Sequence, residues 1–366
     1  MAIRILSNGI QIGDYTLQET RDGLLFNGTV AAKTYYQVKN FQGSVEGHVT
    51  GGSVGTPSPG TTLTSVEKFP FAATTVVGAS VFTLTNSIES HSGHHSDTHA
   101  YMVAGRSFSP GVPGYVYTTS IRKYPFAIPS AGAETNVGVL FAYIPSTPQR
   151  AYHSGHSSSN WGFISGGVNG APLVATNLIE RFPFAYDNSS EVTGNLTQSG
   201  MGAAALNSVT HGYNAGRATN VPGGGVFSQT IDKFPFIGEN NSSIVGNLIF
   251  ARAWSSGGAS SQISGYITGG STSPGPLAPT TNIQKFSFAN ETTQTSVGVL
   301  TQARWGVTNH SSLTDAYTSG GNIQPVGTVS PGQTTTIDKF SFGNDMDAAA
   351  VGALTNARFM AAGHHY

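Results

Sequence analysis

The sequence contains no cysteine, few charged residues and no long apolar run. Without cysteine, the chain can form neither a disulfide framework nor a thiolate metal site. Charged residues make up 10% of the chain, against about 25% in an average soluble domain, and the formal net charge is −1. No cluster of Lys and Arg could neutralise nucleic-acid phosphates, and no apolar run approaches the ~20 residues of a membrane-spanning helix. We therefore expect neither a nucleic-acid partner nor a membrane span.

The N-terminal sequence lacks the apolar stretch of a secretory signal peptide. We expect the chain to be made in a cytoplasm without an export signal. What the chain has in abundance is glycine, with 47 residues, together with Ser, Thr and Asn. This composition predicts a surface of small neutral polar groups. At 366 residues the chain can bury a large core, and a single all-β domain can reach this length.

One aromatic motif recurs six times along the chain. It consists of Lys or Arg, an aromatic residue, Pro or Ser, and Phe, and successive copies begin 55, 58, 52, 52 and 54 residues apart. The copies occupy residues 68–71, 123–126, 181–184, 233–236, 285–288 and 339–342. Self-similarity at a period of this length is the signature of a repeat architecture.

Three further signals accompany each copy of this motif. Before it stands an aromatic residue or His followed by one or two Gly, beginning at His48, Tyr101, Phe163, Tyr213, Tyr266 and Tyr317. After it comes a Val-Gly or Thr-Gly pair, at residues 77–78, 137–138, 193–194, 245–246, 297–298 and 351–352. The unit closes with a His, at His94, His156, His310 and His364, whereas Asn207 and Gly258 take this place in the other two copies.

These signals predict β-strands. The two rings of the aromatic motif are two residues apart, so they lie on one face of a strand. We favour the interpretation that they fill the gap between neighbouring sheets. The alternative is that they form an exposed strip that stacks on sugars. Pro lacks an amide donor and is expected at a strand end, an edge or a bulge, and the double Gly predicts a turn or a close backbone approach. Three or four strands in each of six units predict an all-β fold, a six-bladed β-propeller. Because the last copy ends within its closing signal, we expect the ring to close on the first copy.

Residues 1–45 lie outside the repeat, and residues 46–366 form the predicted propeller. The turn signals Asn8-Gly9 and Asp22-Gly23 separate short apolar stretches, which predicts a small N-terminal β-hairpin or meander. Such a segment is too small to be stable alone. It must pack on the propeller, on another copy of itself or on a partner. The alternative is that it supplies a closing strand for the last blade.

Four His residues at one repeat position are the candidate metal ligands, namely His94, His156, His310 and His364. Neutral imidazoles bind Zn, Cu or Ni. We favour the alternative that each His lies in a turn and hydrogen-bonds to the backbone of its own blade. Neighbouring positions of a ring are usually too far apart to share an ion, and no carboxylate recurs beside these residues. The sequence predicts no cofactor.

Charged residues also recur within the units. The recurring acids, which precede the first residue of the aromatic motif, are Glu67, Glu180, Asp232 and Asp338. The recurring basic residues of the last three copies are Arg252, Arg304 and Arg358. We expect the acids to be structural partners, and the arginines to pair with carboxylates or carbonyls between blades. A ring of anion-binding forks is the alternative. No convergent carboxylate pair or nucleophile elbow is apparent, so we expect no enzyme and assign no catalytic residue.

The segments after the double Gly vary in length and sequence. They are rich in Gly, Pro, Ser and Thr, and they occupy residues 53–62, 106–119, 168–176, 217–229, 271–281 and 322–335. We expect them to cluster on one face of the ring, where loops on a rigid scaffold often carry binding residues. The alternative is that they are unconstrained connections.

The double-Gly strand followed by an aromatic strand resembles the kelch repeat, so the propeller is expected to be kelch-like. The fuller pattern is similar to repeats in structural proteins of tailed phages, including cyanophages. It comprises Ile-Asp-Lys-Phe-Pro-Phe at 231–236, Val-Gly-x-Leu-Thr-x-Ala-Arg at 297–304 and Ala-Gly-His at 362–364. The opening sequences Ile-Leu-Ser-Asn-Gly-Ile and Leu-Leu-Phe-Asn-Gly-Thr resemble the start of phage tail and fibre proteins.

The resemblance implies a virion protein of the tail or baseplate. Residues 1–45 would bind other virion proteins, and the propeller would present its loops to a host-surface polysaccharide. Several copies on each particle, with a homo-oligomer left open, would compensate a low affinity by avidity. Two alternatives remain, a non-adhesive kelch-type scaffold that cements virion components and a carbohydrate-active enzyme.

Overall fold

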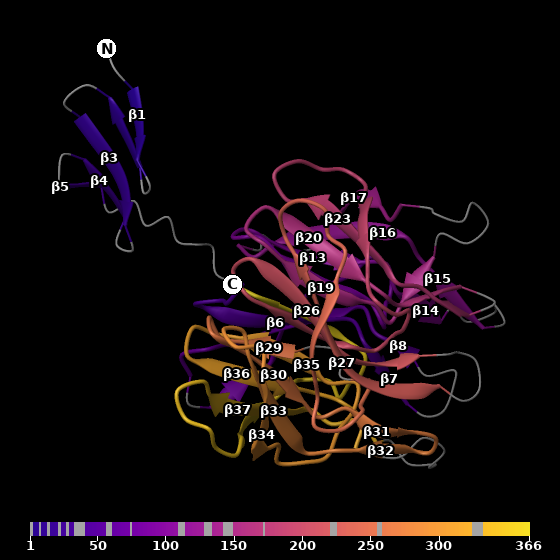
Figure 1. The fold of residues 1–366 in the computed structure, drawn as a ribbon. Coiled ribbons are helices and arrows are strands. Elements are labelled where there is room, and N and C mark those ends of the chain that lie inside the picture. The colour runs from indigo at the N-terminus through magenta and orange to yellow at the C-terminus, as the bar shows by residue number, and fades with distance from the viewer. Residues whose placement is uncertain are drawn as a thin grey trace. The chain divides into compact units, whose positions relative to one another are not determined.

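The computed structural model describes residues 41–55, 61–73, 75–108, 114–127, 134–141, 149–170, 173–219, 225–254, 258–323 and 332–366, and the backbone of five strands within residues 3–32. Every regular element in these ranges is a β-strand (Figure 1). No described segment forms a helix long and apolar enough to cross a membrane. The chain divides into two compact units, Met1–Asn40 and Phe41–Tyr366.

The N-terminal unit is a single antiparallel sheet of five strands in chain order. The strands are β1 (Ile3–Leu6), β2 (Gly9–Ile12), β3 (Tyr15–Thr20), β4 (Gly23–Phe26) and β5 (Thr29–Ala32). Leu6 pairs with Gly9 and Thr20 with Gly23, so two residues connect each of these strand pairs. Asn8 and Asp22 of the turn signals lie outside the described residues. Gly9 and Gly23 are the first residues of β2 and β4, one position beyond the central turn position that Asn-Gly and Asp-Gly pairs usually give to Gly.

The described part of the second unit contains six main sheets, numbered here in chain order, each with four antiparallel strands, and the sixth has a fifth short strand at its edge. Their first strands are β39 (Ala362–His365), β12 (Ser92–His95), β19 (Ser154–Ser157), β25 (Ala204–Asn207), β29 (Gly258–Ser260) and β35 (Thr308–Ser311). Their second strands are β6 (Glu46–Thr50), β13 (His99–Val103), β20 (Trp161–Ser165), β26 (His211–Thr219), β30 (Ser264–Thr268) and β36 (Asp315–Ser319).

The third and fourth strands complete these sheets. The third strands are β9 (Ser65–Pro70), β16 (Ser120–Pro125), β23 (Leu178–Pro183), β27 (Val226–Pro235), β33 (Asn282–Ser287) and β37 (Thr336–Ser341). The fourth strands are β11 (Ala79–Thr83), β17 (Thr135–Val139), β24 (Glu191–Asn195), β28 (Ser243–Asn247), β34 (Thr293–Val299) and β38 (Ala349–Ala353). A short strand, β10 (Val76–Val77), pairs in parallel with β38.

The sequence repeat is offset from the sheets by one strand. Each unit supplies the second, third and fourth strands of one sheet, and its closing Gly-His signal forms the first strand of the next sheet. Sheet 1 therefore takes its first strand, β39, from the C-terminal end of the chain, where His364 pairs with His48 and Gly363 with Val49. The alternative gave residues 1–45 a closing strand in the last blade, but the described strands of sheet 6 are β35–β38, from residues 308–353, with β10 from residues 76–77 added at its edge.

The first strands contact one another in cyclic order. Each contacts the first strand of the next sheet from β12 through β35, and β39 contacts both β35 and β12. Residues 41–45 belong to this unit as well. The Gly43 amide donates to the Ser311 carbonyl at 2.8 Å, and the Val45 amide donates to the Tyr366 carbonyl at 2.6 Å. The units therefore divide five residues before the predicted boundary at residue 45.

The aromatic motif fills the space between neighbouring sheets, as we favoured. The aromatic residue of each second strand packs on the rings of the next sheet's third strand, with centroids 4.7–5.0 Å from the motif's final Phe. The pairs are His48–Phe126, Tyr101–Phe184, Phe163–Phe236, Tyr213–Phe288, Tyr266–Phe342 and Tyr317–Phe71. The motif's first ring is at most 4% exposed in every copy, so the exposed sugar-stacking strip is wrong.

Proline and glycine take the predicted places. Each motif Pro is the last residue of its third strand, at Pro70, Pro125, Pro183 and Pro235. Gly51 and Gly52 have φ angles of +58° and +94°, and a Cβ atom at Gly51 would lie 2.2 Å from the Ile88 carbonyl oxygen. The double Gly is therefore both a turn and a close backbone approach.

Candidate binding face

The four candidate metal-ligand His residues are fully buried in first strands, and each links two sheets. The Nδ1 atom of His94 lies 3.0 Å from the His156 carbonyl oxygen, and that of His364 lies 3.0 Å from the His94 carbonyl oxygen. His156 and His310 reach the carbonyls of Leu206 and His364 in the same way. A carbonyl can only accept, so Nδ1 carries the proton. The hydrogen bond crosses to the next sheet, which corrects our expectation of a turn bonded within its own blade.

The other ring nitrogen of each His accepts a hydrogen bond from a hydroxyl. The donors are Ser92, Ser165, Ser319 and Thr50, at 2.8–3.3 Å. Burial lowers the pKa of His94 to about 4 and that of His156 and of His364 to about 3. Both nitrogens of these rings are therefore engaged by protein groups. No three His, Asp or Glu side chains in the described ranges are placed to hold a metal ion together.

The strand register corrects the alignment of the other two copies. The His position lies opposite the aromatic residue of the second strand, as His94 lies opposite Tyr101. In sheets 4 and 5 the residues opposite Tyr213 and Tyr266 are Leu206 and Ala259. Asn207 and Gly258, which the sequence placed there, are each displaced by one residue.

The recurring acids are buried and bind arginine. The carboxylates of Glu67, Glu180, Asp232 and Asp338 are 0% exposed. Their partners are respectively Arg358, Arg150, Arg217 and Arg304. Arg304 and Arg358 also donate to backbone carbonyls at the double-Gly turn, such as Gly320 and Gly51. Arg304 and Arg358 therefore bind carboxylates and carbonyls of the chain itself, instead of forming part of a ring that binds external anions.

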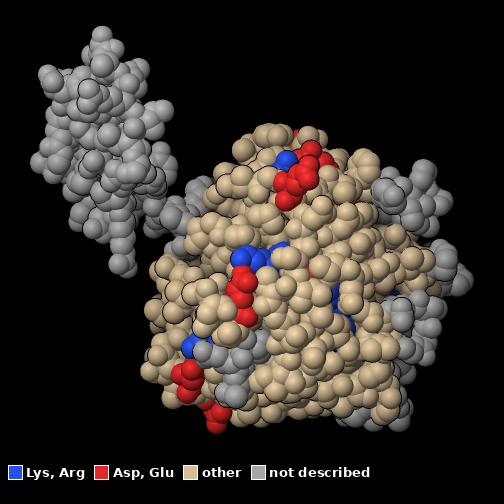
Figure 2. Space-filling model, viewed as in Figure 1, with Lys and Arg blue, Asp and Glu red and all other residues tan. Residues whose placement is uncertain are grey.

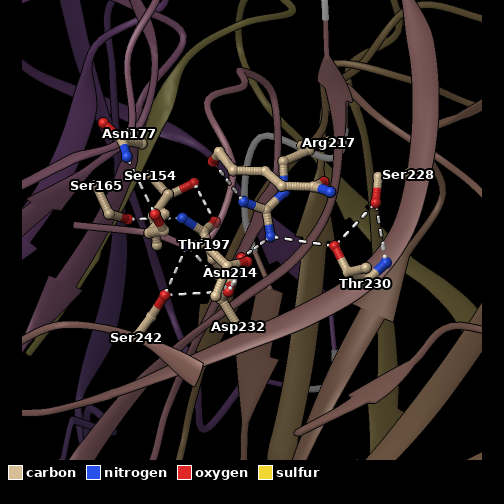
Figure 3. Close-up of polar contacts among 12 residues, drawn as sticks. Ser154, Ser165, Asn177, Thr197, Asn214, Arg217, Ser228, Thr230, Asp232 and Ser242 are labelled. Carbon is tan, nitrogen blue, oxygen red and sulfur yellow. Dashed lines mark hydrogen bonds and ion pairs between the residues drawn. The ribbon is translucent and has the colours of Figure 1, made fainter. Parts of the chain in front are cut away.

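Sheet 4 builds its ion pair differently. The residue six positions before the His position is Gly200 here, where Arg304 and Arg358 stand in other copies. Arg217 enters from the double-Gly turn instead, and a Cβ atom at Gly200 would lie 2.7 Å from its side chain. Figure 3 shows Arg217 between Asp232 and Thr230, with Thr197 and Ser242 also donating to the carboxylate. Neither Arg150 nor Arg217 was among the predicted ion-pair partners, although Arg150 stands six residues before His156, the spacing that Arg304 and Arg358 keep to His310 and His364.

The variable segments form hairpin stems that gather on one side of the unit, at the right of Figure 1. The stems are β7 (Ser53–Val54) with β8 (Thr61–Thr62), β14 (Arg106–Phe108) with β15 (Tyr115–Tyr117), β21 (Val168–Asn169) with β22 (Val174–Ala175), and β31 (Ser271–Pro274) with β32 (Leu277–Pro279). In sheet 4, β26 and β27 extend to form the stem, and in sheet 6 Asn322 bridges to Gln333. Most of the tips lie outside the described residues. The expected clustering on one face agrees with these stems.

A closed circuit of backbone hydrogen bonds lies at the base of the hairpins. Each first strand is preceded, a few residues earlier, by a residue in the left-handed conformation. The φ angles of these six residues lie between +54° and +66°. Each amide donates to the carbonyl of the preceding member at 2.7–2.9 Å, and the first donates to the last. The members, which we call the floor ring, are Ser90, Tyr152, Gly202, Trp254, Gly306 and Met360.

Large and small residues alternate around the floor ring. Tyr152, Trp254 and Met360 are separated by Ser90, Gly202 and Gly306. A Cβ atom at Gly202 would lie 3.0 Å from the Trp254 indole, so the small members make room for the large ones. Tyr152 and Trp254 meet edge to face with centroids 5.2 Å apart, and both remain partly exposed. A cavity of about 20 Å³ lies beside them.

The β14–β15 hairpin continues this aromatic surface. The Arg106 guanidinium lies 3.6 Å from the centroid of Tyr115 and 4.7 Å from that of Tyr152. It also binds the carboxylate of Glu89 at 2.8 Å. Phe108 packs against Tyr115, and the partly exposed Tyr117 lies opposite Arg106 in the hairpin. The floor ring and this hairpin together form the candidate binding face.

No family model matches the chain, and no curated protein matches it. Among the solved structures that match, the structure of YjhT has a TM-score of 0.60 and 13% sequence identity, covering 79% of this chain and 94% of that chain. At this identity the likeness shows the fold alone. Together with the many antiparallel sheets, it shows that the chain has an all-β, propeller-like fold.

Proposed function

We propose that this chain is a structural protein of a tailed-phage virion that presents a six-bladed β-propeller to a host-surface glycan. Residues 1–40 attach the chain to other virion proteins of the tail or baseplate, and the candidate binding face meets the host. The observation that carries the proposal is a face of partly exposed aromatic rings on a rigid scaffold, with no unpaired charge among its described residues. The motif resemblance to phage structural proteins supports the virion setting.

Three observations support six blades in a closed ring. The six sheets share one strand order, their first strands contact in a cycle, and β39 joins the end of the chain to sheet 1. The floor ring adds six hydrogen bonds that return to their starting residue. The aromatic contacts form the same cycle, since Tyr317 of sheet 6 packs on Phe71 of sheet 1.

The role in adhesion is tested with purified protein and with particles. Fluorescent fusions of the full chain and of residues 41–366 should both adsorb to host cells. Only the full chain should be incorporated into particles, measured by mass spectrometry of purified virions. Absence of the chain from virions, or equal adsorption to cells stripped of surface polysaccharide, would contradict the proposal.

Exposed apolar side chains favour a second candidate, a non-adhesive scaffold that cements neighbouring proteins. They lie in the turns between first and second strands, where Ile263 is 71% exposed, Leu313 52% and Val209 46%. Sheets 4, 5 and 6 are consecutive, so these residues are neighbours at the ends of the sheets away from the hairpins. Cross-linking within virions distinguishes the two, because a scaffold would be cross-linked through these turns and would leave the hairpin face without a host ligand.

A further inference from the structure

The candidate binding face carries no unpaired charge among its described residues. The six variable segments contain no Asp or Glu and only two basic residues, Arg106 and Arg217. Arg106 is neutralised by Glu89, whose carboxylate is 2% exposed, and Arg217 by the fully buried Asp232. A ligand on this face therefore meets neither a free cation nor a free anion in the hairpin stems.

The exposed charges lie at the other ends of the sheets. The Lys of the aromatic motif stands two residues before the end of its third strand, away from the double-Gly turn where the hairpins begin. Lys123, Lys233 and Lys285 each bind an acid of the next sheet, at 2.5, 2.5 and 2.9 Å. Figure 2 shows charged side chains in small groups of both signs on a surface that is otherwise uncharged. The described charges of the hairpin stems, Arg106 and Arg217, are instead paired with buried carboxylates.

Aromatic rings of the floor ring and of the β14–β15 hairpin are partly exposed on this face. Two of the three Trp residues of the chain, Trp254 and Trp305, belong to the cluster beneath the hairpins, and Trp254 is partly exposed. Tyr152 meets Trp254 at an interplanar angle of 78°. The Arg106 guanidinium lies over both the Tyr115 ring of the hairpin and the Tyr152 ring of the floor. Tyr and Trp combine a large apolar ring with a polar tip, which suits a ligand with both kinds of surface.

We propose that the floor ring and the β14–β15 hairpin bind the uncharged hexose units of a neutral polysaccharide. A pyranose ring presents C–H groups that pack against the Trp254 and Tyr152 side chains, and its hydroxyls reach the Tyr, Ser and Thr hydroxyls and backbone groups of the stems. An acidic sugar would bury a carboxylate without a cation to bind it, which is unfavourable. This inference rests on the proposed function and narrows its ligand to one chemical class.

The test is a printed array of neutral and acidic bacterial oligosaccharides, probed with the full chain displayed on a multivalent carrier. We expect retention on neutral hexose-containing glycans that changes less than twofold between 50 and 500 mM NaCl, because no ion pair is formed. Trp254→Ala and Tyr152→Ala should each weaken retention at least tenfold. Trp161→Ala is the matched control, since Trp161 is also partly exposed but stacks on Arg181 at the other end of its sheet, and it should leave retention unchanged.

The outcomes separate this inference from the proposed function. Retention on acidic glycans alone, weakened by salt, would overturn the neutral ligand and leave host-glycan recognition standing. Retention that survives both substitutions would overturn the site. Absence of retention on every glycan, together with absence of adsorption to host cells, would overturn both. Because Trp254→Ala opens space in the floor, Trp254→Phe and Tyr117→Ser serve as second variants, and thermal melting confirms that each variant is folded.

Discussion

Gln284 is the one neutral side chain among the six residues at the acid position. It stands where Glu67, Glu180, Asp232 and Asp338 bind arginine, and its side-chain carbonyl accepts from the Ile249 amide at 3.1 Å, three residues before the fully buried Arg252. Arg252 donates to the Gly269 carbonyl and to Asn282, but within the described part of the chain it pairs with no carboxylate, and neither its Nε atom nor the Gln284 amide nitrogen has a partner. Burial lowers the pKa of Arg252 to about 9. This part of sheet 5 therefore holds a buried cation without the carboxylate that pairs with arginine in sheets 1, 3, 4 and 6.

Replacing Gln284 by Glu should stabilise the unit. The substitution keeps the shape of the side chain, supplies the missing negative charge and removes an amide nitrogen without an acceptor. We expect Gln284→Glu to raise the free energy of unfolding by about 1–2 kcal/mol at pH 7, measured by chemical denaturation. The matched control is Asp338→Asn, which removes the charge from Arg304 and should lower the free energy of unfolding by about 3 kcal/mol. Equal destabilisation by both substitutions would show that charge compensation is not what these positions require.

At the residue scale, the sequence predicts which side chains of a strand share a face. It does not predict the hydrogen bonds between segments that are far apart in the chain. The aromatic rings follow from a period of two, and their burial followed from their recurrence. The partners of the four His residues could not be predicted, because each hydrogen bond reaches a carbonyl of the next sheet. The floor ring left no signal, since Ser90, Tyr152, Gly202, Trp254, Gly306 and Met360 share a backbone conformation and no residue type.

Among the strands, β39 has a special position because it joins the two ends of the second unit. It supplies the first strand of sheet 1 and contacts the first strands of sheets 2 and 6. Its His364 bonds both to Thr50 in its own sheet and to the His94 carbonyl in the next. Losing this strand would expose the edge of β6 and remove contacts from two further sheets.

Deletion of residues 362–366 should therefore destabilise the whole second unit. We expect the melting temperature to fall by about 10 °C or more, because several hydrogen bonds and buried contacts are lost together. The control is deletion of residues 1–40, which removes a separate compact unit and should shift the melting temperature by less than about 2 °C. If the C-terminal deletion melted like the intact chain, β39 would not be the strand that closes the structure.

The elements themselves were largely predictable, but their grouping was not. Each of the four repeated signals coincides with a strand or a turn, because alternation, Gly and Pro act locally. The assignment of strands to sheets depends on which neighbours pair, and the sequence unit does not reveal that its last strand belongs to the next sheet. The predicted boundary at residue 45 was displaced for the same reason, since residues 41–45 are held by the distant Ser311 and Tyr366.

For the whole molecule, the buried His residues predict a steep dependence of stability on pH. Six of them, namely His91, His94, His153, His156, His310 and His364, are at most 6% exposed and have lowered pKa values caused chiefly by burial. In the unfolded chain each takes up a proton near pH 6.5. In the folded chain it stays neutral until the pH falls to about 4 for His94 and about 3 for His156 and His364.

Acid should therefore destabilise the fold below pH 6.5 and leave it unaffected above pH 7.5. Between these folded and unfolded pKa values, each buried His lowers the free energy of unfolding by about 1.4 kcal/mol for each pH unit of acidification. Within one to two pH units, six such groups together lower the free energy of unfolding by an amount comparable to the whole stability of a typical domain. Most carboxylates are still ionised in this pH range. Denaturation midpoints at pH 7.5, 6.5, 5.5 and 5.0 measure this loss.

The variant His156→Leu distinguishes these His residues from other acid-sensitive groups. Sheet 4 already carries Leu206 at the same position, so the side chain fits the packing of a first strand. His156 faces the Leu206 carbonyl, Ser165 and the neutral His94, and losing its two hydrogen bonds should cost about 1–2 kcal/mol at pH 7.5. The variant should then lose about 1.4 kcal/mol less than the parent for each pH unit below 6.5, because one proton fewer is taken up on unfolding. A parallel pH profile in parent and variant would mean that His156 is already protonated in the folded chain. Its Nε2 would then donate to Ser165 instead of accepting from it, whereas the Nδ1–H bond to the Leu206 carbonyl would be the same in both states.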